Sequence, residues 1–330
     1  MTDSPTDLPA RSWWALLKRT VRGFQKDNLT DWAAALTYYG VLSLFPAIIV
    51  LSAVLAMLGP SATATLVENV NALAPGAAAD IITGALRELQ GNASIAGPLA
   101  IVGLVGALWS ASGYVGAFMR ASNSIYEMPE GRPVWKTVPL RVAITLGVVV
   151  LLAVSAAGVV ATGGIADRLG SALGIGSTGV LVWEIAKWPV IALLVSLALA
   201  ILYWAAPNVR HPRFRWLSPG GVLAVVLWVL ASVAFGLYVA NFGSYNKTYG
   251  SLGGVIGFLV WLWISNLAVL LGAELDAEIA RAKAISEGGP TDREPFLPPR
   301  DTRSLDDEEE REIKPVLTER DRTEAAHRRG

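Results

Sequence analysis

An uncharged run of 26 residues, from Ala33 to Leu58, constrains the fold more than any other stretch of this sequence. At a helical rise of about 1.5 Å per residue the run reaches roughly 39 Å, whereas the hydrocarbon core of a bilayer is about 30 Å thick. A tilted helix of this length crosses a membrane. Because the run is too long for the apolar part of a cleavable signal peptide, we expect it to remain as an anchor.

Five further apolar runs follow the first one. Charged residues make up 16% of the chain and hydrophobic residues 53%, whereas an average soluble domain is about 25% charged. We therefore predict an all-α polytopic membrane protein with six transmembrane helices. The predicted spans are about 33–58, 97–118, 138–161, 181–204, 219–240 and 252–274.

The segments that connect the predicted spans differ in basic charge. One side carries twelve Lys and Arg residues, within 11–26, 120–141 and 210–215, and the other side carries three, Arg87, Arg168 and Lys247. Cytoplasmic loops of membrane proteins are enriched in Lys and Arg. An even number of spans puts both termini on one side, and this charge count places that side in the cytoplasm.

Composition divides the chain into three parts. We predict a cytoplasmic or interfacial amphipathic leader over 1–31 and a six-helix membrane domain over 32–284, with short amphipathic helices within 61–94. Residues 285–330 hold 13 acidic and nine basic residues with little apolar periodicity. This composition predicts a disordered acidic cytoplasmic tail.

The leader contains apolar residues at helical spacing, namely Trp13, Trp14, Leu17, Val21 and Phe24, with Lys and Arg largely on other faces. A basic amphipathic helix with tryptophans suits the headgroup layer of an anionic leaflet. It equally suits a soluble helix that covers the cytoplasmic ends of the bundle. The sequence leaves both interpretations open.

The first span is unusually polar in its first half. Five of its residues are candidates for one wall of a transport cavity: Thr37, Tyr38, Tyr39, Ser43 and Pro46. A proline in mid-span lacks the amide hydrogen of its helical hydrogen bond, so we expect a kink or local unwinding there. Asp31, just before the apolar run, is either a helix cap or part of the same cavity.

Polar groups inside lipid are costly and mark functional positions by default. Glu184 and Lys187 lie one turn apart in the fourth span, which suits an interfacial ion pair or a gate. Asn266, in the sixth span, either links helices or lines a cavity. Glu274 lies where that span reaches the cytoplasm, and Tyr245 belongs to a segment of hydrogen-bonding residues that we interpret as an outer vestibule.

No residue pattern points to catalysis. The chain has no cysteine and only two histidines, His211 and His327, which lie far apart in the sequence. We find no nucleotide-binding glycine loop, no HExxH and no GxSxG, and no cluster of residues at metal-ligand spacing. We therefore predict a protein that is not an enzyme, uses no metal or cofactor and binds no nucleic acid.

Two blocks at the ends of the membrane domain form a specific signature, Ala33–Tyr39 with Leu42–Pro46 and Tyr249–Gly254 with Gly272–Leu275. Further matching positions are Trp109, Ser110, Asn123, Tyr126, Tyr203, Pro207, Asn208, Pro219, Gly220, Trp261 and Ser265. With these residues the chain resembles the YihY/BrkB family of bacterial inner-membrane proteins over about residues 10–284. Asp276 departs from the family, which more often has Asn there.

The resemblance implies six transmembrane helices with cytoplasmic ends in the bacterial plasma (inner) membrane. It implies little about chemistry, because members have carried a ribonuclease label or are described as virulence factors, and transport of lipids or other envelope components has been suggested. The lack of a metal-site pattern in this sequence argues against the ribonuclease label.

Our leading hypothesis is a transporter or flippase-like protein that moves a lipid or another amphiphile through a cavity formed by the first and sixth spans. Its expected partners are membrane lipids and a small amphiphilic substrate. The alternative is a non-transporting scaffold for envelope machinery. The oligomeric state stays open, a homo-oligomer included.

Overall fold

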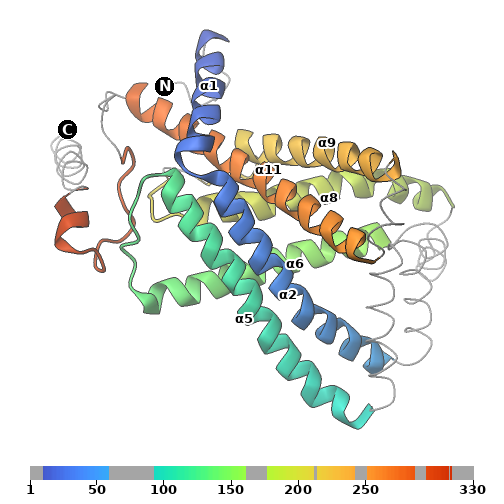
Figure 1. The fold of residues 1–330 in the computed structure, drawn as a ribbon. Coiled ribbons are helices and arrows are strands. Elements are labelled where there is room, and N and C mark those ends of the chain that lie inside the picture. The colour runs from blue at the N-terminus through green and yellow to red at the C-terminus, as the bar shows by residue number, and fades with distance from the viewer. Residues whose placement is uncertain are drawn as a thin grey trace. The chain divides into compact units, whose positions relative to one another are not determined.

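The computed structural model describes residues 10–58, 93–160, 177–211, 214–241, 251–286, 295–311 and 313, and these residues are helical apart from loops and one isolated bridge (Figure 1). The long helices are α1 (Ala10–Lys26), α2 (Leu29–Leu58), α5 (Ala93–Ile125), α6 (Val134–Val160), α8 (Ser177–Ala205), α9 (Pro219–Asn241) and α11 (Ser251–Ser286). The all-α prediction is therefore confirmed for the described residues. The short helices expected within 61–94 lie outside these residues.

Five of the helices are long and apolar enough to cross a membrane. Their candidate spans are Ile101–Ile125 in α5, Val134–Ser155 in α6, Thr178–Ala205 in α8, Pro219–Tyr238 in α9 and Gly253–Ser286 in α11. Each overlaps one of the last five predicted spans. The observed helices α5 and α11 run well past the predicted ends at 118 and 274.

The first predicted span, 33–58, lies within α2, a helix of 30 residues. The backbone is helical through Pro46, and the side chains from residue 44 to the end of α2 are not among those described. The kink expected at Pro46 therefore stays a prediction.

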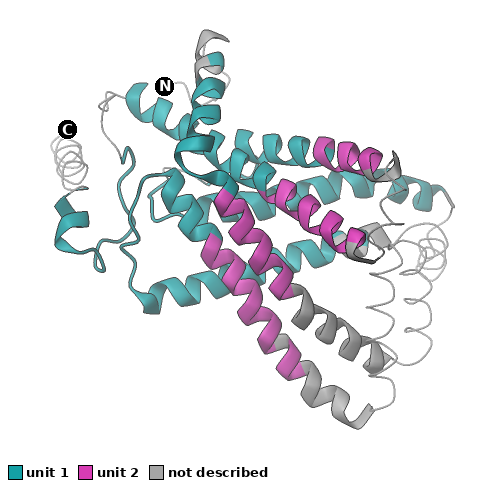
Figure 2. Ribbon diagram, in the orientation of Figure 1, with its two compact units in different colours: residues 1–30, 118–229, 267–330 teal, residues 31–117, 230–266 magenta. Residues whose placement is uncertain are grey.

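The chain forms two compact units, each with its own core (Figure 2). Unit 1 comprises residues 1–30, 118–229 and 267–330, and α6 packs against α8 within it. Its fully buried side chains include Phe118, which stacks on Tyr203 at 6.1 Å between ring centroids. Unit 2 comprises residues 31–117 and 230–266, and its buried residues include Leu36.

Two glycines let α9 and α11 meet backbone to backbone within unit 1. A Cβ atom built on Gly220 would lie 2.0 Å from the carbonyl oxygen of Gly272, and one built on Gly272 would lie 2.4 Å from the carbonyl oxygen of Gly220. Any larger side chain at either position would force the helices apart. Small residues permit this kind of close approach between membrane helices.

The leader forms α1, which has two different faces. Leu16 and Thr20 are buried in unit 1, whereas Trp14, Leu17 and Val21 are exposed. Three of the five residues of the apolar stripe noted in the sequence are thus exposed, and α1 packs through the neighbouring face that holds Leu16 and Thr20. The helix ends at Lys26, and Asn28 in the turn after it has a φ of 50°, a left-handed conformation that asparagine tolerates better than most residues.

Residues 295–311, which lie in the segment predicted as a disordered tail over 285–330, have a defined structure. Residues 285 and 286 complete α11, and residues 295–311 pack on loops of unit 1. Val209 and Pro299 form an antiparallel bridge, and the Arg300 guanidinium lies 4.6 Å from the ring centroid of Trp204. Hydrogen bonds to loop backbone hold the segment, together with the contact of the Phe296 ring with the Tyr126 ring at 5.8 Å between centroids.

Candidate functional site

Three polar side chains link three helices of unit 2. The Asn266 amide on α11 donates from Nδ2 to the Thr37 hydroxyl of α2 at 3.1 Å, and its Oδ1 accepts from the Tyr114 hydroxyl of α5 at 2.8 Å. Thr37 in turn donates to the backbone oxygen of Ala33 at 2.7 Å. The amide is therefore used to join helices, which is one of the two roles that the sequence left open.

The helices around this amide are closely packed. A Cβ atom on Gly113 of α5 would lie 3.0 Å from the Tyr39 ring of α2, and one on Gly40 would lie 3.3 Å from Leu262 of α11. Neither of the two cavities described below is lined by Thr37, Tyr39 or Asn266. The described parts of α2, α5 and α11 thus form a packed contact at the level of Asn266.

The remaining candidates of the first span do not join this contact. Tyr38 is 61% exposed, and Ser43 donates to the backbone oxygen of Gly40 on its own helix at 2.7 Å. Asp31 is exposed in the first turn of α2, where a negative charge is favourable to the helix dipole. The side chain of Pro46 and all of Tyr245 lie outside the described residues.

Glu184 and Lys187 form an ion pair on α8, as their spacing predicts. Lys187 is only 1% exposed, and its ammonium also lies 5.6 Å from the ring centroid of Trp188. A buried lysine held by a carboxylate and an aromatic ring is fully engaged in structure. This geometry fits the interpretation as a structural pair better than that of a gate.

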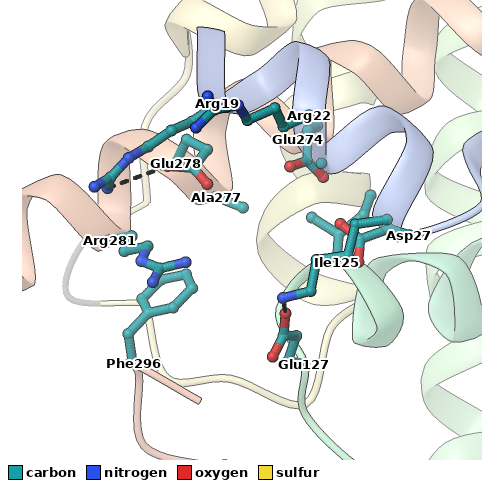
Figure 3. Close-up of a pocket in the computed structure, with 12 residues that line it drawn as sticks. Arg19, Arg22, Asp27, Ile125, Glu127, Glu274, Ala277, Glu278, Arg281 and Phe296 are labelled. Carbon is teal, nitrogen blue, oxygen red and sulfur yellow. Dashed lines mark hydrogen bonds and ion pairs between the residues drawn. The ribbon is translucent and has the colours of Figure 1, made fainter. Parts of the chain in front are cut away.

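A charged cavity of about 230 Å³ lies in unit 1 where α1 meets α11 (Figure 3). Its lining residues are Arg19, Arg22, Gly23, Lys26, Asp27, Ile125, Glu127, Glu274, Ala277, Glu278, Arg281 and Phe296. Two ion pairs cross it, from Arg19 to Glu278 at 3.9 Å and from Lys26 to Glu127. Basic and acidic groups therefore largely balance one another around the cavity.

Glu274 is the deepest acidic group of this cavity, with 3% of its surface exposed. Its carboxylate lies directly over Gly23 of α1, because a Cβ atom on that glycine would fall 1.9 Å from Glu274 Oε1. The carboxyl group hydrogen-bonds to the side chain of Asp27. Its other oxygen, Oε2, is buried and has no hydrogen-bond partner among the described residues.

A second cavity, of about 310 Å³, lies in unit 1 between the ends of α8, α9 and α11. Aromatic and basic side chains line it together, namely Tyr126, Tyr203, Trp204, His211, Arg215 and Lys283. Asp276 is its acidic residue, and its Oδ1 accepts a hydrogen bond from the backbone N–H of Gly220 at 2.8 Å. We call it the aromatic-basic cavity.

His211 is the polar group of the aromatic-basic cavity whose hydrogen bonds are incomplete. Burial, together with the nearby Arg300 guanidinium, lowers the pKa of His211 to about 4, so the imidazole is neutral near pH 7. The ring hydrogen-bonds to the backbone of Tyr203, and its buried Nε2 has no partner among the described residues. Burial also raises the pKa of Tyr126, helped by the negative charges of Asp276 and Glu274.

A hydrogen-bond network fastens the loops of unit 1 beside this cavity. Asn208 is fully buried, and its Nδ2 donates to the backbone oxygens of Pro129 at 3.1 Å and Asp301 at 2.9 Å. Arg132 binds Glu130 through two bonds of 2.6 Å and donates to a further backbone oxygen, of Ala206, at 2.7 Å. These groups position the loop that carries His211 and the C-terminal segment that crosses it.

Among the described residues, no group of three His, Asp or Glu side chains lies close enough to hold a metal ion. The side chains that line the two cavities offer charge, hydrogen bonds and aromatic surface.

Several apolar helices that could span a bilayer, together with cavities at their ends, define a multi-pass helical membrane protein. The chain belongs to the virulence factor BrkB family, because that family's sequence profile matches residues 20–295. The resemblance seen in the signature blocks is thus confirmed.

The relatives include a ribonuclease-like protein and membrane proteins of the UPF0761 group. The ribonuclease-like protein YfkH of Bacillus subtilis (strain 168) is 29% identical over 258 residues, which cover 78% of this chain and 92% of YfkH. A UPF0761 membrane protein of Alkalilimnicola ehrlichii is 32% identical over 275 residues, and one of Xanthomonas oryzae pv. oryzae is 29% identical over 264 residues. The matches cover 78% of this chain but only 56% and 59% of those two proteins. No solved structure matches the chain.

Sequence reasoning found the ion pair, Asn266 and Glu274, but missed the residues that give the cavities their character. Arg215, His211 and Lys283 stand in predicted loops or past a predicted span end, where basic residues are expected for topology alone. The partnership of Asp27 with Glu274 could have been suspected, because both lie at cytoplasmic ends of predicted spans. Its geometry depends on Gly23, which carries no signal of its own.

Proposed function

We propose that the protein moves an anionic amphiphile across the membrane and receives its headgroup in the aromatic-basic cavity. The observation that carries the proposal is the composition of that cavity, in which two cations stand beside aromatic rings at the ends of membrane-length helices. Cations bind a phosphate or carboxylate, and aromatic side chains suit the boundary between headgroup and acyl chain. The proposal assigns no catalytic step and no cofactor.

The charges of the aromatic-basic cavity favour an anionic headgroup. Arg215 and Lys283 bring two positive charges, whereas Asp276 brings one negative charge that the Gly220 N–H already engages. The neutral His211 adds a polar nitrogen without a partner among the described residues, which suits a headgroup that also carries hydroxyl groups. The cavity is therefore suited to a phosphate-bearing, hydroxylated headgroup.

The proposed topology gives the aromatic-basic cavity a side of the membrane. We propose six spans, α2 together with the five candidate helices, with both termini cytoplasmic in a bacterial plasma membrane. The basic segments that hold Arg215 and Lys283 then face the cytoplasm, in agreement with the loop charges. The substrate would come from the cytoplasmic leaflet.

Reconstituted full-length protein tests the proposal. The liposomes contain either labelled phosphatidylglycerol, which is anionic, or labelled phosphatidylcholine, which is not. We expect phosphatidylglycerol to exchange between leaflets faster than phosphatidylcholine. The double variant Arg215→Gln, Lys283→Gln should lose at least about tenfold of that rate, a loss of about 1.4 kcal/mol.

A charge-matched variant separates this effect from a general loss of basic charge. Lys18 and Arg120 are exposed and line neither cavity, so Lys18→Gln with Arg120→Gln should keep the rate. Equal rates for both lipids and for protein-free vesicles would end the transport proposal.

One observation favours the second candidate, a scaffold without transport. The contact of Thr37, Asn266 and Tyr114 is packed at the place where the sequence suggested a cavity between the first and sixth spans. A scaffold would tolerate changes in the aromatic-basic cavity, while chemical crosslinking in cells would recover one constant protein partner. Loss of cellular function in the Arg215 and Lys283 variant would argue against it.

A further inference from the structure

The contact between Asp27 and Glu274 has a chemical requirement that the surrounding residues do not supply. Ionised carboxylates only accept hydrogen bonds, so a hydrogen bond between two carboxyl groups contains a proton. Asp27 is 9% exposed and Glu274 is 3% exposed, and the two side chains are hydrogen-bonded. The pair therefore needs one proton to exist as it stands.

The Glu274 carboxylate is enclosed on the side that faces α1. Oε2 is buried beyond the reach of a water molecule and has no partner among the described residues. Oε1 lies over Gly23, where even a methyl group would collide with it. On the side of Gly23 a metal ion or an ammonium group has no room at this carboxylate, whereas a proton needs none.

Other charged groups face the pair from every packed element, and most are already engaged. They are Arg19, Arg22 and Lys26 on α1, Glu127 after α5, and Glu278 and Arg281 on α11. The titratable Tyr126, whose pKa the Glu274 charge helps to raise, also lies near the pair. Arg19 pairs with Glu278, and Lys26 pairs with Glu127. The C-terminal segment contributes Phe296, which is uncharged (Figure 3).

We propose that Asp27 and Glu274 form a proton-binding site that joins α1 to α11, and that loss of the proton separates the two helices at the charged cavity. Gly23 makes the separation necessary, because it brings the α1 backbone against Glu274 and leaves two negative charges no room to move apart. With the proton bound, the pair fastens α1. Without it, like-charge repulsion opens the cavity between Gly23 and Ala277.

The first test detects the proton directly. Infrared spectra of the full-length protein in lipid nanodiscs should show a protonated carboxyl band near neutral pH that disappears as the pH is raised. Glu274→Gln and Asp27→Asn should each remove this band, and having two such variants covers the failure of either one to fold. The matched variants Glu278→Gln and Glu127→Gln, whose carboxylates pair with Arg19 and Lys26, should keep it. Absence of the band from the unmodified protein, or its survival in both pair variants, would overturn the proposal.

The second test measures the separation. Because the chain contains no cysteine, Ala277→Cys places a single thiol in the wall of the cavity. Its labelling by a maleimide should rise with pH by about tenfold more than in the same variant carrying Glu274→Gln, a shift of about 1.4 kcal/mol in the opening equilibrium. The Glu274→Gln background supplies the intrinsic pH dependence of the thiol. Equal pH dependence in both backgrounds would overturn the opening step. Neither test depends on lipid transport, so the proposed function stands or falls separately.

Discussion

Asn266 and Glu274 are buried polar residues on the same helix, α11, but only one has its hydrogen bonds completed. The Asn266 amide is partnered on both sides, by Thr37 and Tyr114. Glu274, eight residues later, keeps Oε2 without a partner among the described residues and shares its carboxyl group with another acid. The two residues are thus alike in being buried and polar, and they differ in the completeness of their hydrogen bonds.

The largest expected effect on stability follows from replacing Asn266, the residue whose hydrogen bonds are complete. Asn266→Leu removes two hydrogen bonds between helices and leaves the Tyr114 hydroxyl without its acceptor, so we expect a loss of about 2 kcal/mol in the free energy of unfolding. Unfolding by a denaturing detergent in mixed micelles measures it. Ser155→Ala, which removes only a bond within α6, serves as control. If Asn266→Leu lowered stability as little as Ser155→Ala, the contact of Asn266 with Thr37 and Tyr114 would not hold the helices together.

His211, the second incomplete group, gives the next largest effect. Its folded pKa of about 4 lies below the ordinary value of 6.5, so between these values the unfolded chain binds a proton that the folded chain refuses. Stability therefore falls as the pH falls from about 6.5 to 4, by about 1 to 2 kcal/mol after allowance for solvent screening.

Thermal unfolding in detergent at a series of pH values measures this fall. His211→Gln should reduce it, whereas His327→Gln, at the other histidine of the chain, should not. Below about pH 4 a separate loss should begin, because Arg303 and Lys136 hold the pKa of the Asp301 carboxyl below its usual range. An unchanged slope in His211→Gln would contradict the buried neutral imidazole.

A smaller loss of stability is expected from replacing Thr37, a hydrogen-bond partner of Asn266. Thr37→Val removes the hydroxyl that accepts from Asn266, at an expected cost of about 0.5 to 1 kcal/mol. In a double-mutant cycle with Asn266→Leu, the double variant should lose less stability than the sum of the two single losses, because both substitutions remove the same hydrogen bond. Strict additivity would mean that the two side chains do not interact.

The smallest change in stability is expected from replacing Glu274, the residue whose hydrogen bonds are incomplete. Glu274→Gln replaces the protonated carboxyl by an amide of the same shape that still donates to Asp27, so stability near neutral pH should change by less than about 0.5 kcal/mol. The same unfolding measurement that serves Asn266→Leu reports it. A loss as large as that of Asn266→Leu would make Glu274 a structural joint and remove the contrast.

Sequence patterns predicted the membrane-length helices well, because each of them contains a long run of apolar residues. The runs near 97–118 and 219–240 correspond to α5 and α9, since about twenty apolar residues are needed to cross a bilayer. The pattern missed the helical residues that follow an apolar run. The part of α11 beyond residue 274 carries charged residues and belongs to unit 1, so the apolar run alone could not set the end of the helix.

The cavities were less predictable because they depend on close approaches. Gly23 brings Glu274 against α1, and Gly220 brings α9 against Gly272. From the sequence alone, a glycine in a helix can serve close packing, flexibility or no particular purpose, and only its neighbour in the structure shows which. The ordered segment near Asp301 was missed for a similar reason, since the hydrogen bonds that hold it come from Asn208, far away in the sequence.

The contact between Asn208 and Asp301 also bears on how the protein is made. The partners of Asn208 Nδ2 and Oδ1 in the C-terminal segment lie 93 residues later. While the ribosome is still adding those residues, Asn208 can already donate to Pro129, whereas its Oδ1 still lacks the Asp301 N–H from which it accepts in the finished protein. Assembly of this end of the protein is therefore a late step of biogenesis, completed only when the chain beyond α11 has been released to fold back onto it.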